Sequence, residues 1–439
     1  MFFLTHTNKK LLQSVSITVL LKPLSMLISF FYTPLLLSFL GTEQYGVWAT
    51  MMSVLNWLTI FDLGIGGGFR NLLSKKVIDN TKIEIKRVIS TAYVLVSIVS
   101  ITILIIGTVV SIFVNWHKVF NTDVDVQLAV FLILIFICLN FVFGLTGGIL
   151  YAIQKAEYVS FIGLLIQITN FTGIFVIKNI GHPLNNGITM MAGLYLIGGV
   201  FVNIFCLVFI WCKNSNYIPS INFFKKDYVH EIFSFGTKLF FVQIAAMILF
   251  ATDNMIITQL YNPAQVSVYN ITYVLFNVIY SIFYAVLTPM RSRYTMEQER
   301  KNFLWIKKAI QYQLILWIVF VFGVALFCIL FIPITHIWLH KDLNFPNSLI
   351  LTMGVYTCIN MFTGIFAIFL NGTGNINIEL LLGVLGAIIN IPLSIFLAKY
   401  IGFGLSGVCM ATIICQLPGV IFYPIWVYRY LKVRIANLD

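Results

Sequence analysis

The chain of 439 residues is 60% hydrophobic and only 10% charged, and its formal net charge is +12. A mean hydropathy of +0.95 excludes an ordinary water-soluble protein, in which about a quarter of the residues are charged. The chain is also too long to be a single membrane anchor, so its composition indicates many membrane-spanning helices.

Twelve apolar segments follow one another along the chain, each long enough to cross a bilayer as a helix. They lie at residues 14–40, 46–69, 88–114, 127–153, 159–180, 188–212, 232–260, 266–290, 309–333, 347–372, 379–401 and 406–428. Because helices satisfy all their backbone hydrogen bonds within the bilayer, the sequence predicts an all-α integral membrane protein of twelve transmembrane helices.

Basic residues are distributed unevenly between the segments that join these spans. If the N-terminus is cytoplasmic, the inner segments hold 21 of the 27 lysines and arginines, and the outer segments hold four. Cytoplasmic loops are enriched in such residues, so both termini are predicted to be cytoplasmic. The same distribution explains the net charge without a nucleic-acid partner.

The spacing of the loops repeats after about 220 residues, which predicts an internal duplication. A short outer turn and a long basic inner loop (70–87) in the first half have counterparts near Asn262 and at 291–308 in the second. We therefore expect a six-helix lobe at 1–212, a cytoplasmic connection at 213–231, and a second six-helix lobe at 232–439. Duplicated bundles of this kind usually bind their substrate between the halves.

Four basic residues are candidates for binding an anionic substrate. Charged side chains inside a membrane are costly and are therefore functional candidates. Lys22 and Lys238 lie in equivalent spans of the two lobes, whereas Arg70 and Arg291 lie at the inner ends of spans two and eight. The simpler interpretation is that the lysines extend to the headgroups and that the arginines fix the topology.

Two acidic residues within the spans, Asp62 and Asp253, are candidates for coupling transport to a proton or sodium gradient.

The glycines of segment 64–68 do not follow a strand and lack the sixth-position glycine of a nucleotide-binding loop, so helix packing explains them better. The histidines show no metal-ligand spacing. We expect no metal, no cofactor and no catalytic residues.

The pattern LG-x-x-x-YG-x-W from Leu40, followed by FDLGIGGGFR and the basic SKK, resembles bacterial polysaccharide flippases of the Wzx type. The segment TDNMII at 252–257 adds to this resemblance. These flippases belong to the superfamily of MATE-like multidrug and lipid-linked oligosaccharide exporters, whose two six-helix lobes surround a central cavity. The resemblance implies the same fold and a cavity lined by cations.

The resemblance also implies a substrate and a location. The substrate is undecaprenyl diphosphate carrying an O-antigen or capsule repeat unit, moved across the bacterial inner membrane by alternating access. A diphosphate is an anion, which Lys22, Lys238, Arg70 and Arg291 would compensate. Implied partners are the lipid bilayer, a polysaccharide polymerase and a chain-length regulator, with no nucleic acid.

Two other classes of function remain open from the sequence. A multidrug cation antiporter, or another secondary transporter with two six-helix halves, would share the architecture, although a cation exporter should favour buried acids over lysines. A membrane polymerase or ligase commonly carries a large outer loop, and every predicted outer loop here is short. An enzyme is therefore the least favoured interpretation.

Overall fold

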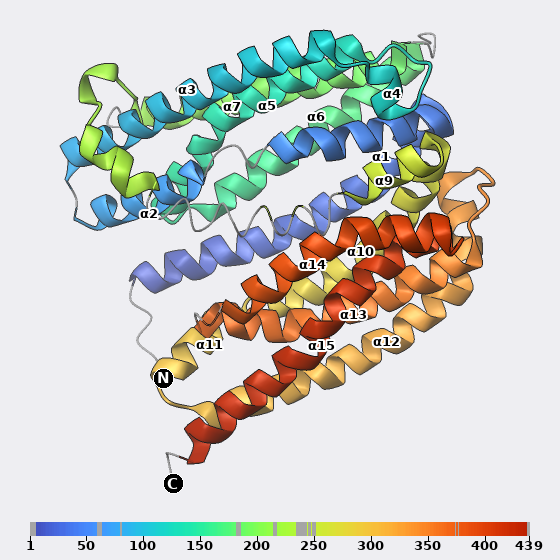
Figure 1. The fold of residues 1–439 in the computed structure, drawn as a ribbon. Helices are drawn as coiled ribbons and strands as arrows, with labels where there is room; N and C mark the ends of the chain where they lie inside the picture. Colours follow the sequence, from blue (N-terminus) through green and yellow to red (C-terminus); the bar gives the residue numbers. More distant parts are fainter. Residues whose placement is uncertain are drawn as a thin grey trace. The chain divides into compact units, whose positions relative to one another are not determined.

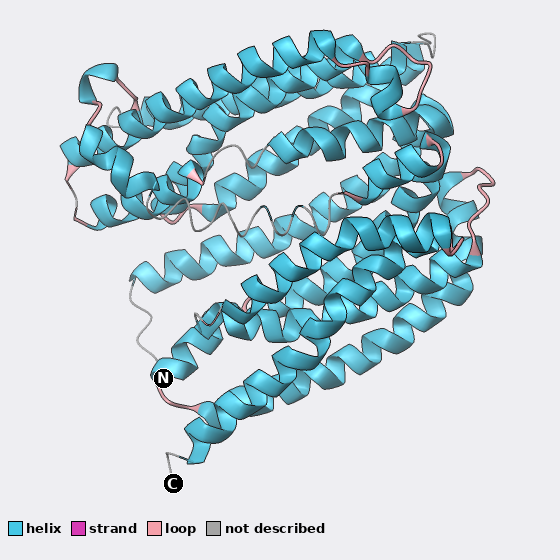
Figure 2. Cartoon of the chain, in the orientation of Figure 1, coloured by secondary structure: helices cyan, strands magenta, loops and turns pink. Residues whose placement is uncertain are grey.

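The computed structural model describes residues 6–58, 64–79, 81–180, 186–213, 217–233, 244, 247, 252–373, 375 and 377–436. The chain forms two compact units, Met1–Ile244 and Ala245–Asp439, each of which is considered by itself. The described residues form helices and loops and contain no strand (Figure 2).

The described part of the first unit is built of the helices that Figure 1 labels α1 to α7, followed by a short helical segment at 226–233. The labelled helices are α1 (His6–Trp57), α2 (Ile65–Ile78), α3 (Lys82–Phe113), α4 (Trp116–Phe120), α5 (Gln127–Ala152), α6 (Ala156–Ile180) and α7 (Gly187–Lys213). Helix α5 packs between α3 and α7, and α1 packs against α6. A 3₁₀ turn, Ile221–Phe223, follows in the connection to the second unit.

The first described helices of the second unit are α9 (Asp253–Leu260), α10 (Pro263–Leu287) and α11 (Met290–Glu299). It continues with α12 (Phe303–Leu339), α13 (Asn347–Thr373), α14 (Asn377–Ile395), a π-helical turn (Phe396–Tyr400) and α15 (Leu405–Ala436). Helix α13 is the centre of this unit, since it packs against α10, α11, α12 and α15 (Figure 1).

The helix starts confirm the predicted spacing between the halves. Helix α3 begins at Lys82 and α12 at Phe303, 221 residues later. The pairs α5 and α13, α6 and α14, and α7 and α15 start 220, 221 and 218 residues apart. The lobe boundary expected at 213–231 stays a prediction. Residues 217–233 are part of the first unit and pack on α3, where the backbone N–H groups of Ser220 and Lys225 donate to the hydroxyls of Ser90 and Thr91.

Ten helices in the described part of the chain are long and apolar enough to cross a membrane. The structure differs from the predicted spans at the start of each unit. Helix α1 includes the first span and the beginning of the second, with a break at Gly41 (φ 76°). The expected continuous span 46–69 is wrong, because a new helix starts after Gly64 (φ 72°), in a left-handed conformation that glycine adopts without strain. Most of the expected span 232–260 lies outside the described residues.

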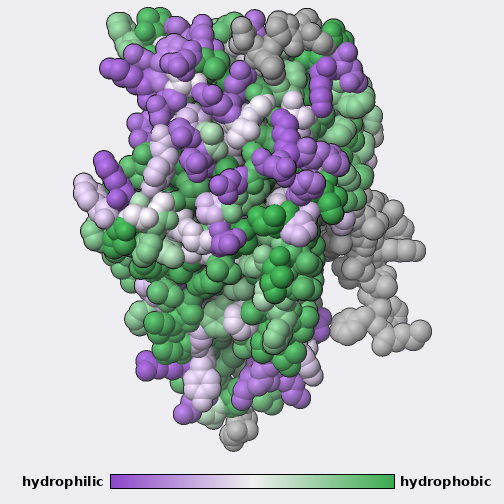
Figure 3. Space-filling view, turned by 90° about the vertical axis from the view of Figure 1, so that its right-hand side faces the viewer, coloured by the Kyte–Doolittle hydropathy of each residue, from purple (hydrophilic) through white to green (hydrophobic). Residues whose placement is uncertain are grey.

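Large apolar side chains cover much of the molecular surface, as a bilayer-embedded protein requires. Phe113 on α3 is 83% exposed, and Ile329 on α12 is 77% exposed. On the face drawn in Figure 3, apolar side chains form broad continuous areas, and hydrophilic side chains gather in separate patches. The chain is thus a multi-pass membrane protein with an all-α fold.

Candidate functional site

Helix α2 is fixed by two of the glycines singled out in the sequence. Gly64 precedes the helix in the left-handed conformation and so sets its direction. Gly68 lies against the backbone of Ile232, since a Cβ there would come within 2.0 Å of the Ile232 carbonyl oxygen. Close packing, as predicted, explains this glycine. Phe69 next to it is fully buried in the core between α2, α3 and α5.

This anchoring presents Arg70 on the exposed side of α2. Its guanidinium lies 4.2 Å from the centre of the Tyr151 ring on α5. Among the described residues, the guanidinium has no hydrogen-bond acceptor and no ion-pair partner. A cation over an aromatic face is stabilised by the ring quadrupole while its N–H edge stays available for a ligand.

Arg70 and Tyr151 border a cavity of about 440 Å³ within the first unit. Further polar side chains line it, namely Asn140 and Thr146, also on α5, and Asn203 on α7. Glycines leave room for it: a Cβ at Gly144 would meet no atom within 4 Å. The site therefore combines one cation, two amides and open space in an otherwise apolar helix bundle.

The chemistry of this cavity suits an anion that carries several oxygen atoms. A guanidinium can donate two parallel hydrogen bonds to a phosphate or carboxylate. The electrostatic attraction between the arginine and an anion is stronger beside an apolar, membrane-embedded wall than it is in water. The Arg70 cavity, defined by Arg70, Tyr151, Asn140, Thr146 and Asn203, is therefore our candidate anion site.

The second unit holds a different polar site around Asp253, in the first turn of α9. The hydroxyl of Tyr269 on α10 donates to Oδ2 of Asp253 over 2.5 Å. The other carboxylate oxygen, Oδ1, is buried and has no hydrogen-bond partner among the described residues. A buried carboxylate with one unsatisfied oxygen can hold a proton or a small cation.

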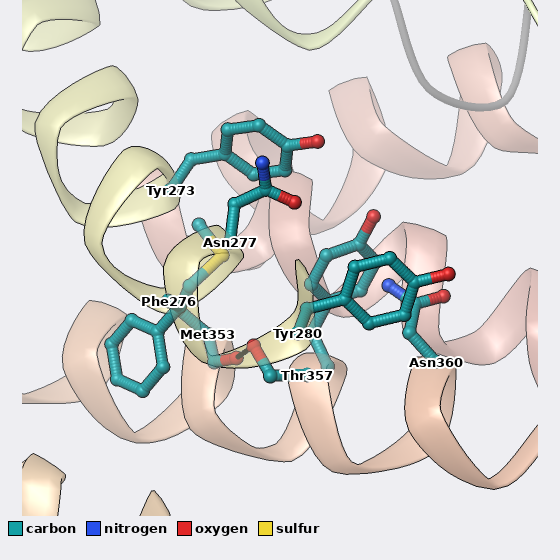
Figure 4. A pocket seen from close by; sticks show the side chains of 8 residues that line it. Tyr273, Phe276, Asn277, Tyr280, Met353, Thr357 and Asn360 are labelled. Atoms are coloured by element: carbon teal, nitrogen blue, oxygen red, sulfur yellow. Dashed lines mark hydrogen bonds between the residues drawn. The ribbon is translucent and has the colours of Figure 1, made fainter. Parts of the chain in front are cut away.

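Near this carboxylate, α10 and α13 form a pocket of about 180 Å³ (Figure 4). Its lining consists of Tyr273, Phe276, Asn277, Tyr280, Met353, Tyr356, Thr357 and Asn360. Tyr273 and Tyr356 also interact electrostatically with Asp253, which places the carboxylate close to the pocket. We call this the tyrosine pocket.

Arg291 lies at the start of α11, where its side chain is exposed. Helix α11 is held against α13 because the hydroxyl of Thr295 donates to the carbonyl of Gly372 over 2.6 Å. Arg291 interacts electrostatically with Glu379 on α14 and forms no ion pair within 4.0 Å among the described residues. Its binding of an anionic substrate stays a prediction.

The other predicted site residues are not tested by the structure. Lys238 and Asp62 lie outside the described residues. Lys22 is part of α1, but the placement of its side chain is outside what the structure describes. In the described part of the chain, no three His, Cys, Asp or Glu side chains cluster as a metal site would require. The prediction of no cofactor remains an expectation.

Sequence reasoning missed the uncharged partners of the site. Tyr151, Asn140 and Asn203 surround Arg70, and Tyr269 contacts Asp253. The signal that would have found several of them is the presence of asparagine inside apolar spans. A membrane-embedded amide needs a partner or a polar cavity, so it carries functional information much as a charge does.

Comparisons with known proteins agree with the fold. The family described as "Polysaccharide biosynthesis protein" matches residues 11–295, and the family described as "MatE" matches residues 239–396. The chain is 24% identical over 86% of its length to a "Putative O-antigen transporter" of Salmonella typhimurium, of which the match covers 87%. It is 23% identical over 80% of its length to a "Putative O-antigen export protein" of Yersinia pseudotuberculosis, of which it covers 81%.

Solved structures show the same fold at low sequence identity. An inward-facing multidrug resistance MATE family transporter matches with a TM-score of 0.77, at 15% identity, covering 94% of this chain and 96% of that one. A transporter of the same superfamily from Pyrococcus furiosus, described as having a binding pocket of reversed polarity, matches with a TM-score of 0.66, at 15% identity, covering 96% and 95% of the two chains. The two-lobed MATE-like fold predicted from the sequence is confirmed.

Proposed function

The chain belongs to the polysaccharide biosynthesis protein family, and we propose that it moves a lipid-linked saccharide across the bacterial inner membrane. The substrate is an undecaprenyl-diphosphate-linked repeat unit of O-antigen or capsule, carried from the cytoplasmic to the periplasmic leaflet. The names of the Salmonella and Yersinia relatives support transport rather than an enzymatic reaction. The polymerase and the chain-length regulator are proposed partners because they act on the exported unit.

The observation that carries this proposal is the Arg70 cavity. A diphosphate that crosses a bilayer must exchange its hydration for protein donors, because an uncompensated charge is costly in a low dielectric. Arg70 offers a fork of N–H donors, and Asn140 and Asn203 add amide groups beside it. The rings and glycines of the same cavity leave room for a headgroup.

The mechanism proposed is alternating access of the two lobes. The diphosphate binds Arg70 from the cytoplasmic side, and the lipid tail stays in the bilayer while the headgroup crosses. Lys22 and Lys238, one in each lobe, are proposed to contact the same diphosphate, and Arg291 is proposed as a site at the entrance. In this mechanism the charged headgroup crosses through the protein interior, whereas the lipid tail does not enter it.

Ion coupling is proposed to reside at Asp253. Its carboxylate has Tyr269 on one oxygen and no described partner on the other, so binding of a proton or Na⁺ would satisfy the free oxygen. Loss of that ion would leave a buried unpaired charge and favour a different packing of α9 and α10. Asp62, outside the described residues, is the proposed second carrier.

The experiment that tests the proposal deletes the gene from its bacterium, restores it as wild type or with Arg70 replaced, and compares the surface polysaccharide of the strains. We expect Arg70→Ala to reduce surface polysaccharide at least about tenfold, since it removes the cation for a charge-assisted bond. Arg70→Lys should restore only part of the loss, because it keeps the charge and lacks the planar fork.

Arg434→Ala is the matched control, because Arg434 is also exposed and also lies over a tyrosine, 5.4 Å from the ring centre of Tyr430. Both variants should reach wild-type protein levels in the membrane. Normal surface polysaccharide in Arg70→Ala would contradict the role of the Arg70 cavity.

A multidrug cation antiporter is the second candidate, favoured by the MatE match at 239–396 and by the buried Oδ1 atom of the half-buried Asp253. The two functions predict opposite selectivity. An antiporter should protect cells against cationic drugs. It should also tolerate Arg70→Ala, because the positive charge of Arg70 would repel a cationic drug and its loss would not weaken binding. A saccharide flippase should give no drug resistance.

A further inference from the structure

We propose that the tyrosine pocket binds one sugar ring of the transported repeat unit. This inference rests on the proposed function, because it assigns the saccharide part of that substrate to named side chains. The pocket lies between α10 and α13 of the second unit and shares no residue with the Arg70 cavity.

The polar groups of the pocket point in a common direction. In Figure 4 the polar ends of Tyr273, Asn277, Tyr280 and Asn360 lie on one side of the two helices, whereas the ring of Phe276 points away from them. Neither the Tyr273 hydroxyl nor the Asn277 amide has a hydrogen-bond partner among the described residues. These groups are therefore available to a ligand.

The walls that carry these groups are rigid. The Phe276 ring is almost fully buried and packs on Phe327 and Phe331, with ring centres 5.1 and 5.8 Å away. The ring of Tyr280 stacks on Tyr284 with a centre-to-centre distance of 5.6 Å. The aromatic surface is thus preformed, which lowers the entropic cost of binding a small ligand.

The size of the pocket limits what it can hold. A volume of about 180 Å³ corresponds to about six water molecules at the density of the liquid. Pockets that enclose a drug-sized ligand have volumes of roughly 300–1,000 Å³, so this pocket is smaller than they are. One monosaccharide ring fits such a space, and a whole oligosaccharide does not.

The charge of the pocket excludes an anionic ligand. None of its eight lining residues is charged, and the acidic group that interacts with its tyrosines is Asp253. A phosphate would be repelled by that carboxylate and would find no basic partner here. The pocket therefore suits a neutral part of the substrate, whereas the Arg70 cavity suits the charged part.

The chemistry of the lining matches a sugar. The faces of a pyranose ring present C–H groups, which pack on aromatic rings such as those of Tyr273 and Tyr280. Its hydroxyls both donate and accept, as do the side-chain amides of Asn277 and Asn360. A quaternary ammonium ligand would also stack on tyrosines, but it would leave the Asn277 amide without a partner.

Binding of simple glycosides to the purified full-length protein in lipid nanodiscs tests this inference. The probes are the methyl glycosides of glucose, galactose and N-acetylglucosamine, followed by saturation-transfer NMR. We expect saturable binding of at least one glycoside, with a Kd of about 1 mM, as befits a single small ring. Tyr280→Leu should weaken it about three- to tenfold, and Tyr280→Phe should weaken it less, because the ring is kept.

The matched control is Tyr312→Leu, which removes a tyrosine that is 70% exposed on α12 and lies outside the pocket. It should bind the glycosides as wild type does. Thermal melting of each variant verifies folding, and Asn277→Ala provides a second pocket variant that keeps all the rings. Equal glycoside binding by wild type, Tyr280→Leu and Asn277→Ala would overturn the inference, and so would binding of tetramethylammonium in place of every glycoside.

The surface polysaccharide of cells carrying the same variants separates this inference from the proposed function. In one outcome, the pocket variants bind glycosides normally, wild type supports surface polysaccharide, and Arg70→Ala does not. In that case the assignment of the sugar site to the tyrosine pocket is wrong, and the proposed function stands. If wild type supports no surface polysaccharide, the proposed function itself fails, whatever the glycosides do.

Discussion

The substitution Gly68→Ala tests how closely α2 must approach the connection between the two units. An added Cβ would lie 2.0 Å from the carbonyl oxygen of Ile232 and 2.8 Å from its carbonyl carbon. Both obstacles are backbone atoms, so α2 or the Ile232 segment must move by about 1 Å. Overpacking of this kind costs about 1–3 kcal/mol, which exceeds the gain of up to about 1 kcal/mol in helix propensity.

Thermal unfolding of the purified protein measures the effect. At about 2–4 °C per kcal/mol, Gly68→Ala should melt several degrees below wild type. Gly163→Ala in α6 is the matched control, because Gly163 is also a helical glycine and a Cβ there would meet no atom within 4 Å. The control should melt at or above the wild-type temperature. Equal melting of Gly68→Ala and wild type would refute the close approach of α2 to Ile232.

Three further predictions concern other polar contacts. Glu297→Gln should lower the melting temperature by an amount equivalent to about 1–3 kcal/mol, because the buried carboxylate pairs with two arginines, whereas exposed Glu299→Gln should not. Tyr228→Phe should loosen the connection and speed its proteolysis, because the hydroxyl donates to Glu84. Burial and this carboxylate raise the pKa of Tyr228, and the Tyr228 hydroxyl lowers the pKa of Glu84. In pH-dependent melting the contact should therefore stabilise fully between about pH 5 and pH 10, and weaken above that range as Tyr228 ionises and below it as Glu84 is protonated. Asp253→Asn should abolish the dependence of reconstituted transport on an ion gradient, and unchanged gradient dependence would contradict its coupling role.

The fold was largely predictable because hydropathy acts over whole helices. Apolar segments of 20 or more residues identified nearly every helix, and the regular spacing of loops anticipated the helix offsets between the halves. The breaks at Gly41 and Gly64 were not predictable, because membrane helices tolerate glycine and only the backbone angles reveal a turn.

The candidate site was predictable only in its charges. Arg70 was found because a cation at the end of an apolar span is conspicuous, but its setting depends on Tyr151, Asn140 and Asn203 from two other helices. Such neighbours are set by helix packing, which hydrophobic patterns do not specify. The tyrosine pocket was missed for the same reason: its residues come from two helices about 80 positions apart.

Transport in proteoliposomes shows whether this protein moves a lipid-linked saccharide across a bilayer. Fluorescent undecaprenyl diphosphate carrying a short oligosaccharide is placed in one leaflet, and its arrival in the other is followed by a membrane-impermeant quencher. We expect rapid transfer by wild type and by Arg434→Ala, and transfer at least about tenfold slower by Arg70→Ala. Transfer by wild type at the rate of protein-free liposomes would contradict the account.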